Sequence, residues 1–525
     1  MKVSMFGSFF LLAAFSSAVA QQVNFSVENV GQNCNASYKA LLATADATLP
    51  DPFAMHSGTR ISDKSEWACR RNEVKKDLEQ YEIGLKPDPS TATVKATYSG
   101  STLTVTITTK DGSINLTSTV SGSGNCVAIG MNNNAGNISG CKQIPFKHDQ
   151  VVAYSMSNDS HNKNDPFYKV YPDLYGKIGK YAAWSWGISR LIDGIVQVKD
   201  QLGVDVTKIG LQGCSYAGKM ALFGGALDER VTLTVVQESG GGGINSWRYS
   251  KAFTARTGTN IEKIDNTSGI WFLNSMKSLN PDKLPHDHHQ LIAMIAPRAT
   301  IILGNPPYEW LGDESGYKST IAARKVWQAF GITDYIGFDF AGGHEHCQAA
   351  SSQSTNVNAF VNRFLKGQNV NTKIEANRPT VSTFVLDTTV SWTVPNLTGT
   401  YPGTASPTSS SSVQGGTSSS SSSRNSSSSR ASSSSSLVAN ISSSSSDATP
   451  ESSSSEEDST PIISNIPITY LSTQALNGVV EIFDIKGNKV ASVNVSDPQA
   501  VKLSLPSGLY FAKALGKQSV KFVVK

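Results

Sequence analysis

The chain has 525 residues, of which 39% are hydrophobic and 16% are charged, and its formal net charge is +4 at pH 7. So small a charge on so long a chain argues against a nucleic acid or an anionic membrane surface as its partner. Beyond the N-terminus, no hydrophobic stretch is long enough to span a bilayer. We therefore expect a protein without a membrane span, made of more than one folded unit.

The first twenty residues have the features of a secretory signal peptide. Lys2 precedes the apolar run from Phe9 to Phe15, and Ala18-Val19-Ala20 forms a signal-peptidase pattern before Gln21. A short N-terminal membrane anchor is the alternative, but the run is too short to cross a bilayer comfortably. We predict export and a mature chain that begins at Gln21.

Six cysteines lie in the mature chain, and an even number suits a disulfide framework in an oxidising compartment. Spacing does not fix the connectivity, but sequence proximity favours Cys34 with Cys69 and Cys126 with Cys141, which leaves Cys214 with Cys347 as a hypothesis. Disulfide-linked α-carbons lie about 5.5–6 Å apart, and each adjacent residue is about 3.8 Å further along the chain. The third pair would therefore hold Ser215 close to His346.

Residues 21–398 are long enough for one large α/β domain. At its centre, a predicted strand (208–212) is followed by a helix-compatible segment (218–227) and then by a second predicted strand (231–237). This βαβ pattern predicts a parallel sheet. Ser215 and Glu238 would then follow the carboxyl ends of strands, where open α/β sheets place their sites.

Ser215 lies in the segment Gly213-Cys214-Ser215-Tyr216-Ala217-Gly218-Lys219. A sharp strand-to-helix turn here would form a nucleophile elbow, although G-C-S-x-x-G differs by one residue from the common G-x-S-x-G. A serine before a helix is by itself more often only an N-cap. The neighbouring cysteine, Glu238 and His346 together favour a catalytic serine.

The segment 343–347 carries two histidines, of which His346 is the expected general base and His344 the alternative. Both could bind zinc together with Cys347, but a disulfide-bonded cysteine cannot ligate a metal. We therefore expect no metal and no cofactor. A second histidine pair, 288–289, precedes an apolar run and is expected to cap and brace a helix.

Serine dominates residues 399–462, which cannot bury enough apolar surface to fold and are expected to form a flexible linker. Residues 463–525 show alternating strands that predict a small β-sandwich, namely 479–484, 490–493, 501–505, 508–513 and 520–524. The pattern Gly508-Leu509-Tyr510-Phe511, with a last strand ending in Lys525, resembles the C-terminal sorting domains of the bacterial type IX secretion system. A carbohydrate-binding module is the alternative, although residues 463–525 lack tryptophan.

The segments around the serine, the acid and the histidine together resemble those of the glucuronoyl esterases, a family of lignocellulose breakdown. That family carries G-C-S-R-x-G-K, Q-E-S-G-x-G-G and G-H-x-H-C, which match residues 213–219, 237–243 and 343–347 here. Supporting matches extend the resemblance over the whole part before the linker, at 49–53, 67–71, 287–291, 295–298 and 392–395.

The resemblance implies an α/β-hydrolase, a three-layer sandwich around a mostly parallel sheet. It also implies a serine esterase that cleaves the ester between 4-O-methyl-D-glucuronic acid of glucuronoxylan and lignin alcohols through an acyl-enzyme. Ser215 would attack the carbonyl, His346 would carry the proton, and Glu238 would orient the imidazole. This acid lies one strand earlier than is usual for the fold, so Glu309, after the predicted strand 300–303, is the alternative.

The resemblance further implies that Lys219, Glu262 and Trp310 contact the sugar. Tyr216 replaces the family arginine that helps to hold the oxyanion, while its backbone amide remains as a donor. Either the phenol hydroxyl or another group substitutes for the arginine, or the enzyme is slow. Ser246 replaces a cysteine found in fungal relatives. The change at Tyr216 leaves two alternatives open, an acetyl or feruloyl xylan esterase and a catalytically weak glucuronoxylan-binding protein. We expect a monomer that is secreted or attached to a bacterial surface through secretion machinery.

Overall fold

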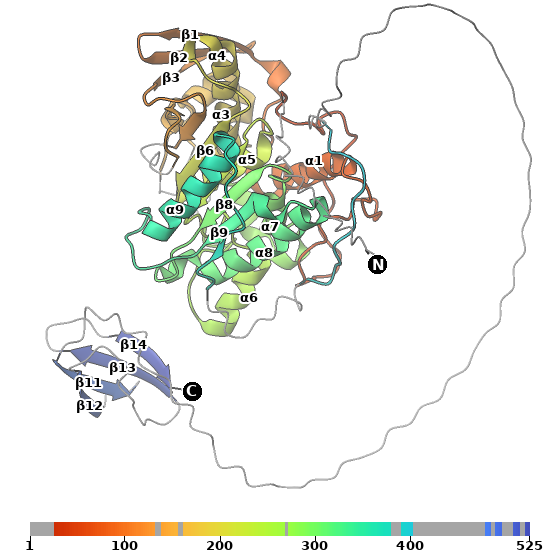
Figure 1. Cartoon of the computed structure of the whole chain (residues 1–525). Coiled ribbons are helices and arrows are strands. Elements are labelled where there is room, and N and C mark those ends of the chain that lie inside the picture. The colour runs from red at the N-terminus through yellow and green to blue at the C-terminus, as the bar shows by residue number, and fades with distance from the viewer. Residues whose placement is uncertain are drawn as a thin grey trace, which may run out of the picture. The chain divides into compact units, whose positions relative to one another are not determined.

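The computed structural model describes residues 26–131, 138–155, 161–267, 271–379 and 390–402, and four strands near the C-terminus. The chain divides into two compact units, Met1–Gln414 and Gly415–Lys525, which are described separately (Figure 1). The expected signal peptide, most of the serine-rich linker and the expected strand 501–505 lie outside the described residues.

The first unit is built around a seven-stranded sheet in the order β10-β9-β8-β7-β6-β4-β5. Every neighbouring pair in this sheet is parallel. The strands are β4 (Val127–Gly130), β5 (Lys142–Gln143), β6 (Ile209–Cys214), β7 (Leu233–Gln237), β8 (Ala299–Leu303), β9 (Ile336–Asp339) and β10 (Glu375–Ala376). The predicted βαβ unit is present as β6, α5 (Tyr216–Leu227) and β7, so the carboxyl ends of β6 and β7 lie side by side.

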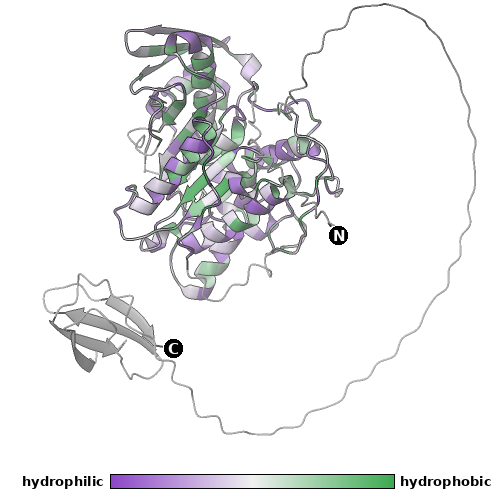
Figure 2. Ribbon diagram, viewed as in Figure 1, coloured by the Kyte–Doolittle hydropathy of each residue, from purple (hydrophilic) through white to green (hydrophobic). Residues whose placement is uncertain are grey.

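Helices cover both faces of this sheet. Neighbouring residues of a strand point to opposite faces, and in β6 each of two neighbours meets a different helix. Gly210 faces Leu365, the last residue of the π-helix Val361–Leu365, whereas Leu211 packs against Gly224 of α5. The remaining helices are α1 (Glu66–Leu78), α2 (Pro166–Val170), α3 (Lys180–Gln197), α4 (Lys199–Leu202), α6 (Trp247–Thr257), α7 (His288–Ala293), α8 (Asp313–Phe330) and α9 (Ser351–Phe360). Helix α5 contacts α3 and α7, α7 contacts α8, and α9 packs on β8 and β9. The central strands are hydrophobic, while the helices also carry hydrophilic stretches (Figure 2).

A separate antiparallel sheet of three strands, β1 (Thr93–Ser99), β2 (Thr102–Thr108) and β3 (Ser113–Thr119), packs on α3. Its inner face is apolar, with Leu103, Val105 and Ile107 of β2 fully buried. The opposite residues of β2 are threonines, which gives the alternation of a half-buried strand. Across the part of the chain that the structure describes, no helix combines the length and the apolar character that a membrane crossing requires.

The second unit contains one antiparallel sheet in the order β12-β11-β13-β14. Its strands are β11 (Gly478–Asp484), β12 (Lys489–Val495), β13 (Gly508–Ala514) and β14 (Val520–Val524). Four of the five predicted strands are therefore present, and β11 and β12 pair as the predicted hairpin. The described residues of this unit make one sheet, whereas the sequence predicted two packed sheets.

Tyr401 anchors the end of the first unit in its core. Its hydroxyl donates to Glu229 Oε1 at 2.6 Å, and its ring lies 6.1 Å from that of Phe330. Glu229 also receives Arg71 at 2.6 Å and the backbone amide of Val30 at 2.6 Å. Tyr401 is 3% exposed and lies beyond residue 398, where the sequence placed the end of the domain.

Candidate active site

Ser215 occupies a tight turn between β6 and α5. Its φ of 58° and ψ of −127° lie in a region that residues with a side chain rarely adopt, and such strain concentrates at functional sites. The turn needs Gly213, because a Cβ there would lie 2.1 Å from the carbonyl oxygen of Ala217. The backbone amide of Ser215 donates to Gln237 O at 3.0 Å, which ties the turn to β7. This is the geometry of a nucleophile elbow.

A disulfide joins the turn to the histidine loop. Cys214 and Cys347 are bonded, with their α-carbons 5.5 Å apart across a sequence separation of 133. The other two disulfides, Cys34–Cys69 and Cys126–Cys141, complete the pairing that sequence proximity favoured. The third disulfide links the residue before Ser215 to the residue after His346.

Glu238 follows β7 and lies against His346. The carboxylate is fully buried, and its Oε2 atom lies 2.6 Å from His346 Nδ1. Oε1 accepts hydrogen bonds from Gln237 Nε2 at 3.0 Å and from the Cys347 amide at 3.2 Å. An ionised carboxylate bonded in this way fixes the imidazole as the Nδ1–H tautomer and leaves Nε2 free to accept a proton.

The serine and the histidine are brought into one site, but they are not directly bonded. Among the described residues, no hydrogen bond joins the Ser215 hydroxyl to the His346 imidazole. Such bonds are often long in the absence of substrate and shorten in the complex. The His346 ring lies 5.0 Å from Trp310 and 5.7 Å from Tyr308, and the Tyr308 hydroxyl accepts from the His346 amide at 3.1 Å. These two aromatic rings form one wall of the site.

The two alternatives from the sequence occupy other positions. Glu309 is exposed in a short 3-10 helix, Glu309–Leu311, and it is Glu238 that reaches the histidine. Both ring nitrogens of His344 contact backbone carbonyls at 3.0 Å, those of Ala341 and Glu345, which braces the loop. In the described parts of the chain, the one candidate metal group is Cys214, His346 and Cys347, and the disulfide leaves it without a thiolate ligand.

A second buried carboxylate lies near Glu238. Asp313, the first residue of α8, accepts from the Asn305 amide at 2.5 Å. Burial and the negative charge of Glu238 raise the pKa of Asp313 to about 7, against the opposing hydrogen bond from Asn305. A carboxylic acid with a pKa of about 7 therefore lies close enough to Glu238 to interact with its charge.

The predicted sugar-contacting residues Lys219, Glu262 and Trp310 are connected to one another and to the aromatic wall. Lys219 Nζ lies 2.8 Å from Glu262 Oε2 and 5.5 Å from the centre of the Trp271 ring. The Glu262 amide donates to Trp310 O at 3.3 Å, which connects this group to the aromatic wall beside His346. Trp310 is 43% exposed and therefore available for stacking on a sugar. Trp271 was not predicted, since no motif around it separates it from core tryptophans.

Tyr216, the residue directly after Ser215, packs among aromatic rings. Its ring lies 4.0 Å from that of Tyr154 and 6.1 Å from that of Trp271. Its hydroxyl lies 3.2 Å from Nε2 of His148, a fully buried histidine at the start of a 3-10 helix (His148–Gln150). Neither Tyr154 nor His148 was identified from the sequence, because their neighbourhood depends on the tertiary fold.

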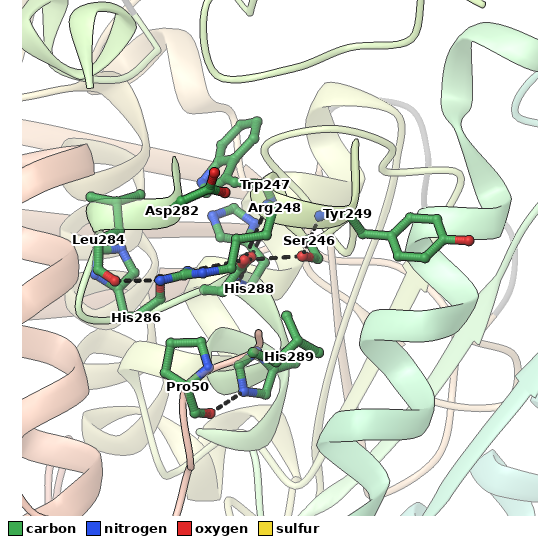
Figure 3. A network of polar contacts seen from close by, with 12 residues as sticks. Pro50, Ser246, Trp247, Arg248, Tyr249, Asp282, Leu284, His286, His288 and His289 are labelled. Atoms are coloured by element: carbon green, nitrogen blue, oxygen red, sulfur yellow. Dashed lines mark hydrogen bonds and ion pairs between the residues drawn. The ribbon is translucent and has the colours of Figure 1, made fainter. Parts of the chain in front are cut away.

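A buried polar network supports the loop that follows Glu238 (Figure 3). Ser246 caps α6 by accepting from the Tyr249 amide at 3.1 Å, and its hydroxyl donates to Asp287 at 3.0 Å. Asp287 also receives Arg248 and forms the capping box of α7. The sequence predicted that His288 and His289 cap and brace a helix, but the cap is the aspartate and the histidines are the first two residues of α7. Ser246, which the resemblance expects in place of a cysteine, is thus a buried and hydrogen-bonded serine in this chain.

His288 is the positively charged member of a second buried network, which contacts the loop after Glu238 at Gly243. Its Nδ1 lies 2.5 Å from the carbonyl oxygen of Gly243, and its Nε2 lies 2.8 Å from Glu82 Oε2. Two acceptors require two N–H groups, so His288 is an imidazolium. Burial acts to lower the pKa of His288, but the charge of Glu82 and these hydrogen bonds outweigh it and raise the pKa. Glu82 also receives His286 and Trp247.

We expect His288→Gln to lower the free energy of unfolding by about 3–5 kcal/mol, because it leaves Glu82 without a buried cation. A raised histidine pKa stabilises the fold fully below about pH 6.5, and this contribution is lost as the pH rises through the folded pKa. The variant should therefore lose least stability at alkaline pH. The melting temperature between about pH 6 and pH 10 measures the effect.

His289 is the matched control for this prediction. Burial lowers its pKa to about 4, so its contribution to stability is lost as the pH falls below about 6.5, the opposite sign. Its Nε2 contacts Pro50 O at 2.8 Å. His289→Gln should leave the alkaline decline in melting temperature unchanged. Equal pH profiles for the two variants would contradict a buried charge on His288.

Comparison with known proteins shows the family of this chain. Residues 94–331 match a family model described as "Glucuronyl esterase, fungi". The 4-O-methyl-glucuronoyl methylesterase of Podospora anserina is 37% identical over 371 residues, which cover 66% of this chain and 74% of that protein. The chain belongs to the glucuronoyl esterase family.

Solved structures of glucuronoyl esterases share the fold. The catalytic domain from Hypocrea jecorina is 33% identical with a TM-score of 0.62, and the match covers 68% of this chain and 98% of that domain. A serine-to-alanine mutant of the Sporotrichum thermophile glucuronoyl esterase, in complex with methyl 4-O-methyl-β-D-glucopyranuronate, is 34% identical with a TM-score of 0.63. That match covers 69% of this chain and 100% of that one. The predicted α/β-hydrolase fold of the first unit is thereby confirmed.

Proposed function

We propose that this glucuronoyl esterase hydrolyses esters of 4-O-methyl-D-glucuronic acid, with Ser215, His346 and Glu238 as its catalytic triad. The observation that carries the proposal is the 2.6 Å contact between Glu238 and His346, tied to the serine turn by the Cys214–Cys347 disulfide. Relatives of this chain are 4-O-methyl-glucuronoyl methylesterases. A relative's structure contains a methyl glucuronate ester.

The residues support a two-step reaction. His346 Nε2 takes the Ser215 proton as Oγ attacks the ester carbonyl, and then gives it to the departing alcohol. Glu238 stabilises the imidazolium that forms between these steps. Water, activated by the same histidine, then cleaves the acyl-enzyme and releases the uronate. The amides at the start of α5, including that of Tyr216, would then donate hydrogen bonds to the oxyanion.

The natural substrate we propose is the ester between glucuronoxylan and a lignin alcohol. An esterified uronate has no charge at its carboxyl group, which suits a site of hydroxyl contacts and stacking surfaces rather than an arginine clamp. Lys219, Glu262 and Trp310 would hold the sugar. The three disulfides and the absence of a free cysteine fit a secreted enzyme. We further propose a bacterial, monomeric enzyme whose second unit serves export or surface attachment.

Whether the Tyr216 hydroxyl stabilises the oxyanion can be tested by removing it. Loss of a full oxyanion donor lowers kcat by about 10²–10³. Because the hydroxyl contacts His148 at 3.2 Å, we expect it to orient the ring rather than to hold the oxyanion. Tyr216→Phe should then lower kcat on benzyl glucuronate by less than about tenfold. A loss of about 10² or more would instead assign the oxyanion to the phenol.

The test of the proposed function is a comparison of substrates with the purified mature protein. We expect turnover of benzyl glucuronate and methyl glucuronate, with much slower turnover of 4-nitrophenyl acetate and methyl ferulate. The reverse preference would identify an acetyl or feruloyl esterase. Binding of glucuronoxylan without turnover of any ester, and with the same affinity in Ser215→Ala, would identify a binding protein.

A further inference from the structure

The lysine beside the nucleophile already has an anionic partner. Lys219 lies one turn beyond Ser215 on α5, and its amide donates to Ser215 O at 3.0 Å. Its side chain is 4% exposed, and its ammonium group lies 2.8 Å from Glu262 Oε2. The other carboxylate oxygen of Glu262 accepts from Thr267 Oγ1 at 2.6 Å, which fixes the acid in place. The pair Lys219–Glu262 therefore has no net charge.

Hydrolysis changes the charge of the bound uronate. The substrate is a neutral ester, and cleavage of the acyl–Ser215 bond by water yields a carboxylate and a proton. An unpaired ammonium group about 5–6 Å along the same helix face would attract this carboxylate and slow its release. With the charge of the lysine cancelled, this attraction is removed, while the lysine can still donate hydrogen bonds to hydroxyl groups.

Further carboxylates lie around the reacting position. Glu238 is bonded to His346, and Glu345 Oε2 accepts from the Tyr308 hydroxyl at 3.0 Å. Tyr308 in turn contacts the amide of His346. Glu345 is exposed and therefore screened, so the buried carboxylate of Glu238 and the neutral Lys219–Glu262 pair carry the argument. Neither offers a net positive charge to an anionic uronate, whereas a neutral ester needs none.

We propose that Glu262 is a specificity-determining residue that makes the site select neutral uronate esters over free uronates and promotes release of the anionic product. This inference rests on the proposed function, because it takes the uronate to be the acyl group. It concerns the charge of the ligand rather than its sugar hydroxyls, and it predicts weak product inhibition. Such a property suits an enzyme acting where free uronates accumulate from its own reaction.

The test compares Glu262→Gln with the wild type in two assays. One measures inhibition by free glucuronate during hydrolysis of benzyl glucuronate, and the other measures glucuronate binding by calorimetry in a Ser215→Ala background. We expect Glu262→Gln to tighten glucuronate binding by about tenfold, with a smaller change in KM for the neutral ester. The gain should shrink as ionic strength rises from about 0.02 M to about 0.5 M.

Asp265→Asn is the matched control. It removes one negative charge from the same loop, but Asp265 is exposed and paired with Lys263 at 2.7 Å, so the Lys219–Glu262 pair stays intact. Its affinity for glucuronate should change by less than about twofold, because exposed charges are screened. Glu262→Asp, which keeps the negative charge, should not tighten glucuronate binding.

The possible results separate this inference from the proposed function. Unchanged glucuronate affinity in Glu262→Gln, or the same gain in Asp265→Asn, would overturn the role of Glu262 even if the enzyme turns over. Absence of ester turnover in the wild type would overturn the proposed function, while calorimetry would still report the charge effect. If Glu262→Gln fails to fold, Lys219→Met in the Ser215→Ala background gives the opposite test, since an unpaired Glu262 should weaken binding of glucuronate more than binding of the neutral methyl glucuronate. An equal loss for both ligands, as expected from a lost sugar contact alone, would refute the inference.

Discussion

Ser215→Ala is expected to lower kcat for benzyl glucuronate by about 10⁶, to the limit of detection, with little change in the melting temperature. Removal of the nucleophile of a catalytic triad has an effect of this size, because the other members cannot act without it. The Ser215 backbone adopts a φ of 58°, and alanine can retain this turn at the strain that serine already bears. Steady-state hydrolysis and calorimetric unfolding of the purified protein provide the two measurements.

Covalent labelling supplies the control for this prediction. A fluorophosphonate should add one group to the wild type, and peptide mass spectrometry should find it on the peptide that contains Ser215. The alanine variant should not be labelled and should still bind glucuronate. Residual turnover above about 1% of the wild type would mean that another residue is the nucleophile.

Glu238→Gln is expected to lower kcat by about 10⁴, whereas Glu309→Gln should change it by less than about threefold. Glutamine preserves the shape of the acid, but it cannot stabilise the imidazolium or enforce the Nδ1–H tautomer of His346. The buried position of Glu238, 2.6 Å from Nδ1, makes it the acid that the histidine contacts. Glu309 is exposed and serves as a matched carboxylate control.

The same pair of variants decides which acid completes the triad. Equal losses in Glu238→Gln and Glu309→Gln would show that the acid is shared or that the loops rearrange on substrate binding. A large loss in Glu309→Gln alone would contradict the assignment. Melting temperatures are needed beside the kinetics, because Glu238 also accepts the Cys347 amide and its loss can loosen the histidine loop.

Local patterns were sufficient to predict the parts of the site that lie beside regular structure. The apolar run before Ser215 and the β-branched run before Glu238 predicted β6 and β7, and parallel pairing brings their ends together. The cysteines favoured the link between Ser215 and His346. The choice between Glu238 and Glu309 could not be made from sequence spacing, because both follow strands. It depends on which loop the histidine reaches.

Other features depend on contacts between distant segments. Glu82 lies over two hundred residues from His286 and His288, and nothing in the sequence around it distinguishes it from a surface glutamate. The same holds for His148, which reaches Tyr216 only in the folded unit. From residue type alone, glutamate and histidine are expected at the surface. Only the fold shows that these residues are buried together with their hydrogen-bond partners.

The position of Tyr401 bears on how the catalytic unit can be produced without its linker and tail. A recombinant fragment that stopped at residue 398 would delete a buried ring and leave Glu229 Oε1 without its phenol donor. An unsatisfied buried acceptor costs about 1–3 kcal/mol, and the lost aromatic burial adds to that cost. A fragment ending a few residues after Tyr401 keeps both contacts. Low yield or low thermal stability of the shorter fragment would then reflect where it was cut rather than a need for the C-terminal sheet.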